Sequence, residues 1–433
     1  MSTKLYESKK LKEKIYHRKS ESGLNVFYMP KKGYKKQHAI MTVDVGSNTT
    51  IFKPDNSNLF ETLPKGVAHF LEHKMFESLD GDMFDKFSKL GIDSNAYTGF
   101  EETSYLFTST NNFYKGLGYL LHLVQRPCFN EDSVEAEKGI ITQEIKMYKD
   151  DPYSQGFNNL LRSLYRNHPV RDDIAGTEES VSSTTIVDLF ELHEAFYRVE
   201  SSVLFIIGDL DFDEIMSVVN ENEYERDALS STIKRKEIIE DDKIKTNRIV
   251  EHMNIQTPLC YVGFKDTHIP TNGKDRVKRE LALDLILETI FGSSSDFYSN
   301  NYNDGLIDLS FSSSHSSGKD YGYSIIFGQT ENPDKLYEEI KSHIKKPKNE
   351  VFKENDFERI KNKNIGQHIM SFNSIENIAG MFTSYYFEDV NILEVHEILE
   401  EIDYNYALKL INEVLLVKNS AISIVYPIVD KEC

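Results

Sequence analysis

Residues 66–108 read GVAHFLEHKMFESLDGDMFDKFSKLGIDSNAYTGFEETSYLFT and contain each kind of element that decides the fold. The first part predicts two helices, Gly66–Glu77 and Asp82–Leu90, from the helical spacing of its apolar residues. The second part predicts a strand pair with arms Asp93–Gly99 and Thr103–Thr108, which are rich in aromatic and hydroxyl residues. Helices next to a hairpin indicate an α+β fold, in which helices cover one face of a mainly antiparallel sheet.

The sequence on either side extends this pattern over the first half of the chain. Two strands are predicted before the quoted stretch, at Gly23–Met29 and His38–Gly46, and an apolar strand, Ser202–Gly208, closes the half. Between them we expect helices at Phe113–Gln125, Glu131–Tyr148 and on to Tyr165, and Thr185–Tyr197.

The second half repeats the order strand, helices, strand pair, helices, strand with few recognisable identities. An order repeated over about 200 residues predicts two homologous domains rather than a solenoid. We therefore expect a first domain at 1–220, a charged linker at 221–248 and a degenerate second domain at 249–433. The predicted elements of the second domain are strands or strand pairs at Leu259–Phe264, Ile307–Phe327 and Ala421–Tyr426, and helices at Arg276–Phe291, Ser295–Asn303, Pro333–Lys345, Glu354–Tyr386 and Ile392–Val414.

Composition and charge exclude several classes of protein. The formal charge of -20 argues against a nucleic-acid surface, because phosphate binding needs clustered Lys and Arg. The three cysteines, Cys128, Cys260 and Cys433, are far apart and lack C-x-x-C spacing, so neither a disulfide framework nor a structural zinc site is indicated. The polar segment Met1–Lys14 and the lack of any long apolar run predict a cytoplasmic protein without a membrane segment.

The sequence His69-Phe70-Leu71-Glu72-His73 is the sharpest chemical signal. Its two histidines are four residues apart, so on a helix they share one face and can reach one metal ion. Imidazole nitrogens suit Zn²⁺, and Glu72 would lie beside a metal-bound water as a general base should. The competing interpretation is a pair of histidines at the edge of the core, because H-x-x-E-H arises by accident in roughly a few per cent of such chains.

A third ligand is expected on the predicted helix Glu131–Tyr148. Glu137 and Glu144 are two turns apart and share a helix face with Ile141 and Tyr148. Carboxylates on an apolar stripe are costly unless they are paired or bound to a metal. The alternative is a solvated acidic face.

Taken together, these motifs resemble the pitrilysin and insulin-degrading-enzyme family of zinc metallopeptidases, the inverzincins, whose mark is H-x-x-E-H followed by E-x6-E on a later helix. The resemblance covers nearly the whole chain and is closest to the short bacterial members of half length. It implies His69, His73 and Glu144 as Zn²⁺ ligands, Glu72 as general base, and Glu137 as a second carboxylate that orients the ligands.

The family also has an Asn-Ala pair on an edge strand beside the metal, matched here by Asn95-Ala96 within the segment 94–98. The resemblance implies that this strand pairs with an extended peptide substrate and that Asn95 adds an amide contact. The alternative is a hairpin strand that binds nothing.

The second half departs from the family pattern. The family carries an Arg and, a few residues later, a Tyr that hold the substrate carbonyl and the developing oxyanion. Here Tyr302 and Asp308 stand at the matching places, and an acidic Asp308 cannot donate to an oxyanion. The resemblance therefore implies a heterodimer with a homologous chain that carries the Arg/Tyr pair, with a homodimer as the alternative.

The sequence thus predicts a zinc metalloendopeptidase that hydrolyses unfolded peptides, as one subunit of a two-chain enzyme. Two other functions stay open. The chain could be a non-catalytic assembly subunit that keeps the fold, since fold does not imply function. It could also be a processing peptidase that makes one defined cut.

Overall fold

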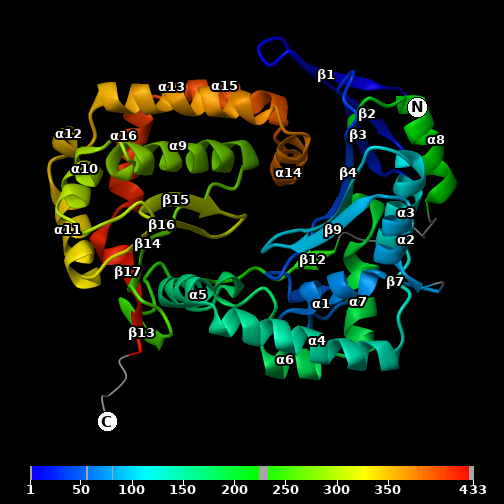
Figure 1. Cartoon of the computed structure of the whole chain (residues 1–433), viewed down its shortest axis with the longest axis horizontal. Helices are drawn as coiled ribbons and strands as arrows, with labels where there is room; N and C mark the ends of the chain where they lie inside the picture. The colour runs from blue at the N-terminus through cyan, green and yellow to red at the C-terminus, as the bar shows by residue number, and fades with distance from the viewer. Residues whose placement is uncertain (1, 55–56, 80, 224–232, 429–433) are drawn as a thin grey trace.

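Two mainly antiparallel sheets, one from each half of the chain, form the framework of the protein in a computed structural model (Figure 1). The structure describes residues 2–54, 57–79, 81–223 and 233–428. Residues 224–232 of the predicted linker and Cys433 lie outside this part. The predicted α+β fold with two domains is confirmed.

The first sheet has seven strands in the order β1-β2-β3-β11-β4-β10-β9. Neighbouring strands are antiparallel except β3 and β11, and β9 forms one free edge. The predicted hairpin is present, with Thr98 opposite Thr103. The strands are β1 (Lys4–Ser8), β2 (Glu13–Lys19), β3 (Asn25–Pro30), β4 (Gln37–Val43), β9 (Asp93–Thr98), β10 (Thr103–Ser109) and β11 (Ser202–Gly208).

Helices of the first half cover one face of this sheet. Their apolar residues form one core with alternate strand residues such as Leu204 and Ile206 of β11. The helices are α1 (Val67–Met75), α2 (Met83–Lys89), α3 (Phe113–Gln125), α4 (Glu131–Asp150), α6 (Glu178–Ser183), α7 (Ile186–Phe196) and α8 (Phe212–Asn222), with 3-10 turns η1 (Pro169–Arg171) and η2 (Val199–Ser201). Short strands in the loops are β5 (Ile51–Lys53), β6 (Glu61–Thr62), β7 (Glu77–Ser78) and β8 (Gly81–Asp82).

The second sheet has five strands in the order β13-β17-β14-β16-β15, so β15 is an edge strand. Its strands are β13 (Arg248–Met253), β14 (Leu259–Asp266), β15 (Ser312–Ser317), β16 (Gly322–Gln329) and β17 (Ser420–Pro427). The helices around it are α9 (Gly273–Phe291), α10 (Asp296–Asn303), α11 (Pro333–Lys345), α12 (Lys348–Val351), α13 (Glu354–Ser371), α15 (Val395–Glu401) and α16 (Tyr404–Val414), with η3 (Ile392–Glu394) and η4 (Val417–Asn419).

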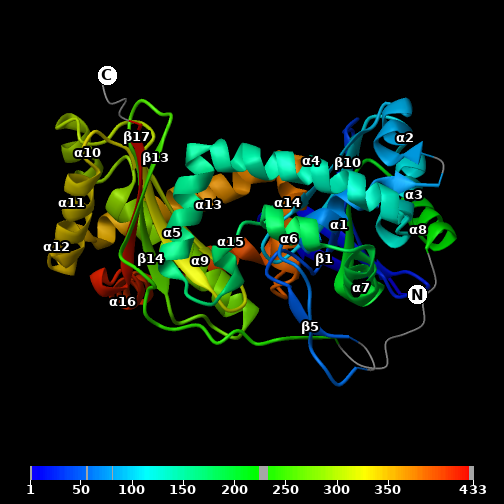
Figure 2. The same ribbon diagram turned by 90° about the horizontal axis from the view of Figure 1, so that it is seen from below.

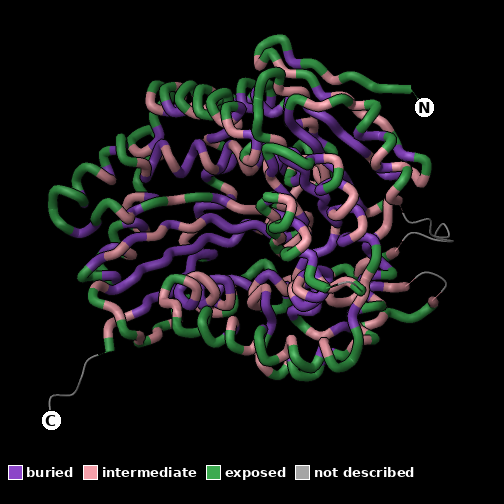
Figure 3. Tube along the Cα trace, turned by 45° about the vertical axis from the view of Figure 1, so that its right-hand side comes forward, coloured by how far each residue is buried: buried purple, intermediate pink, exposed green. Residues whose placement is uncertain are grey.

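The two halves exchange one helix each. Helix α5 (Pro152–Leu164) belongs to the first half but packs on the second sheet, whereas α14 (Ile375–Tyr386) belongs to the second half and packs on the first. Phe382 of α14 stacks on Phe205 of β11 with ring centroids 4.2 Å apart. Figures 1 and 2 show α4 leading from the first sheet to the second, where α5 continues. Each sheet therefore has a helix of the other half on its second face, and Figure 3 shows the strands as the most buried parts of the chain.

Some elements differ from the sequence prediction. The polar segment at the amino terminus forms β1 and the start of β2, and β1 is the edge strand of the first sheet opposite to β9. The long helix predicted at Glu354–Tyr386 is two helices, because Ser374 caps α14 by accepting a hydrogen bond of 3.2 Å from the N–H of Asn377. Helix Ile392–Val414 is likewise divided before Tyr404, where Asp403 caps α16. No helix in the described ranges is long and apolar enough to cross a membrane.

The segment predicted as a linker, 221–248, begins within the last residues of α8. Its described part contains β12 (Lys234–Arg235), which pairs with β5. Further along, Glu240 accepts a hydrogen bond of 2.6 Å from Nζ of Lys265 on β14. The segment is thus held against the first half at one point and the second half at another.

Candidate active site

Helix α1 presents both histidines of the H-x-x-E-H motif on one side. The helix starts after Gly66, whose φ of 82° and close approach to the backbone of Ala175 leave no room for a side chain. Phe70 and Leu71 turn into the core and fix the helix on the sheet. The rings of His69 and His73 then lie with centroids 4.6 Å apart.

Helix α4 brings the two glutamates of the E-x6-E motif to the histidines. Oε1 of Glu144 lies 3.6 Å from Nε2 of His69, and Oε2 lies 3.4 Å from Nε2 of His73. Oε1 of Glu137 lies 3.0 Å from Nδ1 of His73. One ligand atom from each of His69, His73 and Glu144 falls within 4.8 Å of the others. Across the described ranges no other set of three His, Cys, Asp or Glu side chains meets this criterion.

The donor set fits a zinc ion. Two imidazoles and one carboxylate are typical of a catalytic zinc site with a position left for water. Within the described part of the chain, Glu144 has ion pairs only with the two histidines and none with Lys or Arg. Nδ1 of His69 is buried and has no hydrogen bond to a described residue. Glu144 lies on an apolar face of its helix, where an acid needs a partner, and the two histidines are that partner.

Glu137 lies on the far side of His73 from Glu144. It also approaches Nζ of Lys74 at 3.5 Å, and Lys74 is fully buried and bonded to Glu77 and to the carbonyl of Ser133. The hydrogen bond with His73 holds the pKa of Glu137 below its ordinary value. Nδ1 of His73 thus faces Glu137, and Nε2 faces Glu144.

The histidines and glutamates of the cluster shift each other's pKa values. Hydrogen bonds with His69 and His73 hold the pKa of Glu144 far below its ordinary value. Burial lowers the pKa of His73, but its hydrogen bonds with Glu137 and Glu144 more than offset this and raise the pKa to about 9. The carboxylates of the cluster thus favour a positive charge beside them.

Glu72 is 9 % exposed and lies beside the cluster. Burial raises the pKa of its carboxyl group, and a hydrogen bond from Thr98 opposes that rise. Oγ1 of Thr98 donates to Oε2 of Glu72 at 2.6 Å. The sequence motifs assign no role to Thr98, which lies within the segment 94–98. Its signal is the strand period of two, which places Thr98 on the same face of β9 as Ala96.

The residues Asn95 and Ala96 lie on the free edge strand β9, but they point to opposite faces. Ala96 lines the cavity that contains the cluster, whereas Asn95 is exposed. Oδ1 of Asn95 accepts a hydrogen bond of 2.9 Å from the N–H of Ala96. A peptide that pairs with Ala96 must therefore displace the Asn95 side chain.

The cavity has a volume of about 440 Å³ and is lined from both α1 and α5. Tyr148, Phe157 and Ile174 give it apolar walls, and Asn158 and Asp173 add polar ones. Helix α5 packs on the second sheet, so this part of the cavity wall is held in place by the second half of the chain. The space suits a peptide segment with an apolar side chain.

Tyr302 and Asp308 do not approach this cluster. Tyr302 is on α10, which Figure 1 shows at the outer edge of the second half, far from α1. Tyr302 is exposed and stacks on Tyr298, and Asp308 accepts a hydrogen bond of 2.8 Å from the N–H of Ser310. Neither side chain can act on a group bound at His69 and His73 of the same chain.

The chain matches peptidase family models and proteins named as zinc proteases. Family models described as insulinase (peptidase family M16) and as the peptidase M16 inactive domain match residues 41–178 and 183–364. A Bacillus subtilis protein named uncharacterized zinc protease YmfH is 41% identical over 397 residues, 92% of each chain. An M16-like peptidase from Alicyclobacillus acidocaldarius has a TM-score of 0.90 and 31% identity, with 99% of both chains covered.

A protease from Helicobacter pylori shares the fold with a TM-score of 0.81 at 18% identity, with 96% of this chain and 100% of that one covered. The resemblance carried by H-x-x-E-H and E-x6-E is therefore confirmed over almost the full length. The named zinc proteases support a peptidase role and a zinc requirement. The chain belongs to peptidase family M16.

Proposed function

We propose that the protein is a zinc metalloendopeptidase that hydrolyses unfolded peptides at the His69, His73 and Glu144 cluster. The single observation that carries this proposal is the position of Glu72. Its buried carboxylate, held by Thr98, lies in the same cavity as both histidines and Glu144. A non-catalytic assembly subunit, the competing function, has no need of a buried acid beside three metal-ligating groups.

His69, His73 and Glu144 would hold the ion, and Glu137 would keep the His73 ring in place. Zinc, when bound, supplies a Lewis acid that polarises the scissile carbonyl and acidifies a water molecule. Glu72 takes a proton from the attacking water, and the new C–O bond forms as the carbonyl π electrons move to oxygen. Glu72 then gives this proton to the amine nitrogen as the C–N bond breaks.

Substrate would bind in an extended form along the free edge of β9. Backbone pairing with an edge strand gives affinity without sequence specificity, and it requires an unfolded segment. The Asn95 side chain, now bonded to the N–H of Ala96, would turn to contact the peptide. Folded proteins do not offer such a segment, which supports peptides as the substrate class.

The oxyanion donors would come from a second chain. Tyr302 and Asp308 do not line the cavity that contains the cluster of their own chain. The full reaction would therefore need a heterodimer with a homologous chain that carries the Arg/Tyr pair. A homodimer is the alternative. We place the protein in the cytoplasm, because Cys128 and Cys260 are free thiols and suit a reducing compartment.

The test compares wild type with Glu72→Gln and His73→Ala for zinc content and for cleavage of an unstructured peptide, each with the partner chain present if one is needed. Wild type should bind one zinc per chain. Glu72→Gln should keep zinc and lose cleavage, because an amide cannot accept the proton. His73→Ala should lose both. Cleavage by Glu72→Gln at the wild-type rate, or full zinc in His73→Ala, overturns the proposal.

A further inference from the structure

A second cavity lies where the two halves of the chain meet. Its volume is about 290 Å³, and its walls come from the β9–β10 turn, the start of α9, the β15–β16 turn and the end of α14. Phe100 lines both this cavity and the one that contains the histidines. The two spaces therefore adjoin, and one extended peptide can reach both.

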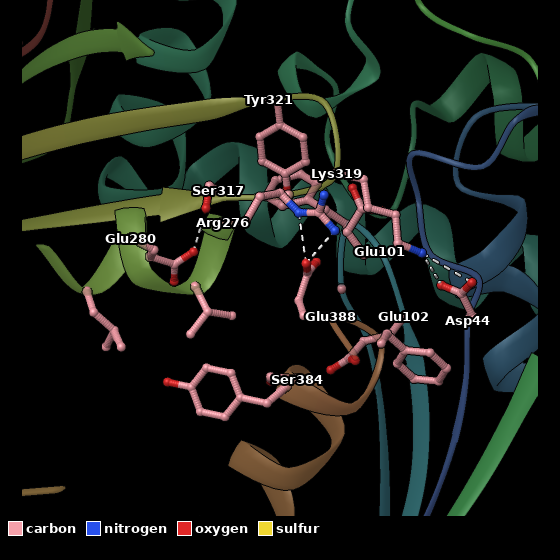
Figure 4. A pocket seen from close by; sticks show the side chains of 17 residues that line it. Asp44, Glu101, Glu102, Arg276, Glu280, Ser317, Lys319, Tyr321, Ser384 and Glu388 are labelled. Carbon is pink, nitrogen blue, oxygen red and sulfur yellow. Dashed lines mark hydrogen bonds and ion pairs between the residues drawn. The ribbon is translucent and has the colours of Figure 1, made fainter. Parts of the chain in front are cut away.

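The charge of this second cavity is unbalanced. Five carboxylates line it against two cations, Arg276 and Lys319, and both cations are already paired. Nε of Arg276 donates to Glu388 at 2.8 Å, and Nζ of Lys319 donates to Asp44 at 2.9 Å, as the dashed lines in Figure 4 show. The carboxylates that have no ion pair with a described residue are Glu101, Glu102 and Glu280.

These three acids differ in how their oxygens are satisfied. Glu101 accepts a hydrogen bond of 3.0 Å from Asn48, and Glu280 accepts one of 2.6 Å from Ser317. The carboxylate of Glu102 has no hydrogen bond to any residue in the described ranges, although its backbone carbonyl accepts one of 2.8 Å from the N–H of Gly99. Burial, with Asp44 and Glu101 nearby, raises the pKa of Glu102 to about 7. An incoming cation would relieve this repulsion and stabilise the carboxylate.

The hydroxyl of Tyr321 is a second, independent sign of a ligand. Tyr321 lines the cavity and is only 4 % exposed, yet its hydroxyl makes no hydrogen bond to a described residue. The hydroxyl is therefore available to a group bound in the cavity, as donor or as acceptor. The Tyr321 ring meets that of Phe100 edge-on, with centroids 6.2 Å apart. Aromatic rings beside carboxylates are the surroundings in which proteins hold guanidinium and ammonium groups.

We propose that this cavity is a subsite for a basic side chain of the peptide substrate, with arginine preferred over lysine because its planar guanidinium can bond several carboxylates at once and stack on aromatic rings. The inference rests on the proposed peptidase function and names a substrate preference for it. Figure 4 shows the carboxylates of Glu102, Glu280 and Glu388 on different sides of the space that the side chain would enter.

The strand β9 sets the distance between this subsite and the cleaved bond. Thr98 contacts Glu72, and Glu101 lies three residues further along, in the turn that joins β9 to β10. The basic residue should therefore be two to four positions from the cleaved bond. A peptide antiparallel to β9 runs away from the second cavity, so the basic residue should lie on the amino-terminal side of the bond.

The test begins with an unstructured peptide whose cleavage site is mapped by mass spectrometry with the zinc-loaded chain, together with its partner where activity needs one. Single positions on both sides of the bond are then replaced by arginine, lysine or the neutral isostere citrulline. We expect kcat/KM to favour arginine over citrulline by about tenfold or more at one position before the bond, with lysine between them.

Substitutions in the cavity locate this preference. Glu102→Gln keeps the shape of the side chain and should bring the arginine-to-citrulline ratio close to one, and Tyr321→Phe should lower it less. Glu339→Gln, an equal change of charge on the exposed face of α11, should leave the ratio as it is in wild type. A ratio near one at every position in wild type, or a ratio that Glu102→Gln does not change, overturns the subsite.

A binding measurement separates this inference from the peptidase proposal. Fluorescently labelled arginine and citrulline peptides are titrated with chains that carry Glu72→Gln, with and without Glu102→Gln. If no peptide is cleaved by wild type but the arginine peptide binds more tightly in a manner that needs Glu102, the subsite stands and the peptidase function fails. If peptides are cleaved with no dependence on arginine, the peptidase stands and the subsite fails.

Discussion

Thr98 donates a hydrogen bond of 2.6 Å to Glu72 and so connects the edge strand β9 to the acid beside the histidine pair. The strand that would hold the substrate is the same strand that holds the proposed general base. Movement of β9 on substrate binding would therefore change the position of the Glu72 carboxylate. This coupling gives the first prediction.

Thr98→Val should lower kcat about tenfold to a hundredfold while zinc content stays at one per chain, because a hydrogen bond to a charged group contributes about 1.5 to 3 kcal/mol. Thr98→Ser keeps the hydroxyl and should restore most of the rate. Steady-state kinetics on one peptide, with zinc measured in the same samples, checks this. Equal rates for the Val and Ser variants would show that the hydrogen bond does not orient Glu72.

The two glutamates of α4 should differ in their effect on zinc. Glu144→Gln should lose most of the zinc, because it removes a proposed ligand, whereas Glu137→Gln should weaken zinc affinity by about tenfold to a hundredfold through the His73 ring. Glu135→Gln, an exposed change on the same helix, is the matched control and should match wild type. Chelator competition at fixed pH gives the affinities.

The order of these effects tests the ligand assignment. Zinc binding only to the native state raises the melting temperature. A chelator should therefore lower the melting temperature of wild type and of Glu137→Gln but leave Glu144→Gln unchanged. A larger zinc loss in Glu137→Gln than in Glu144→Gln would exchange the roles of the two acids.

Much of this site could be predicted from the sequence because helix periodicity fixes it locally. The spacing of His69 to His73 and of Glu137 to Glu144 places each pair on one helix face wherever the helices lie. The strand pairing that brings Thr98 onto Glu72 could not be predicted in the same way, because a serine or threonine in a hairpin has no spacing rule for a partner on a distant helix. The second cavity also needs residues from both halves.

The exchanged helices α5 and α14 also could not be placed from the sequence, because their packing depends on contacts between distant parts of the chain. The apolar residues of α5 and α14 predict helices with one buried face, but a helical pattern does not say which sheet it will cover. Likewise, the lysine-rich segment that forms β1 reads as a polar terminus, because an edge strand needs few apolar residues. The division between α13 and α14 depends on one capping residue, Ser374.

The packing of α5 on the second sheet depends on Gly156. A Cβ atom at this position would lie 2.4 Å from Cε2 of Tyr261 on β14. Gly156→Ala should therefore destabilise the protein by about 1 to 3 kcal/mol through overpacking. Gly366→Ala on α13, where a Cβ atom meets nothing within 4 Å, should stabilise it by up to about 1 kcal/mol. Urea unfolding of both variants checks the opposite signs, and a stable Gly156→Ala protein would mean that Tyr261 moves freely.

Glu240 should make stability depend on pH. It accepts hydrogen bonds of 2.8, 2.7 and 2.8 Å from the backbone N–H groups of residues 166–168, besides that from Lys265. Burial opposes ionisation, but these bonds outweigh it and lower the pKa from 4.5 to about 2. Because the folded-state pKa lies below the unfolded one, the stabilisation is complete above about pH 4.5 and is lost as the pH falls towards 2.

Glu240→Gln should therefore cost about 2 to 3 kcal/mol at pH 7, and the difference from wild type should shrink below pH 4.5. Glu237→Gln, an exposed acid in the same segment, should have no effect at either pH. Urea unfolding of all three proteins at pH 7, 5.5 and 4 measures this. A difference that stays constant to pH 4 and below would show that the ionised carboxylate is not what stabilises the segment.

The last prediction concerns the partner. Tyr302 and Asp308 stand where an Arg/Tyr pair is expected, and α10, which carries Tyr302, lies far from α1, which carries His69 (Figure 1), so this chain alone should be a poor peptidase. A homologous chain that carries the pair and lacks H-x-x-E-H should raise kcat/KM by about a hundredfold to a thousandfold for each donor it supplies. The same partner with its Arg changed to Ala is the control and should give much less. If this chain instead forms a homodimer, Tyr302→Arg with Asp308→Tyr should raise its own activity. Full activity in a monomer that neither change affects would mean that residues of the same chain stabilise the oxyanion.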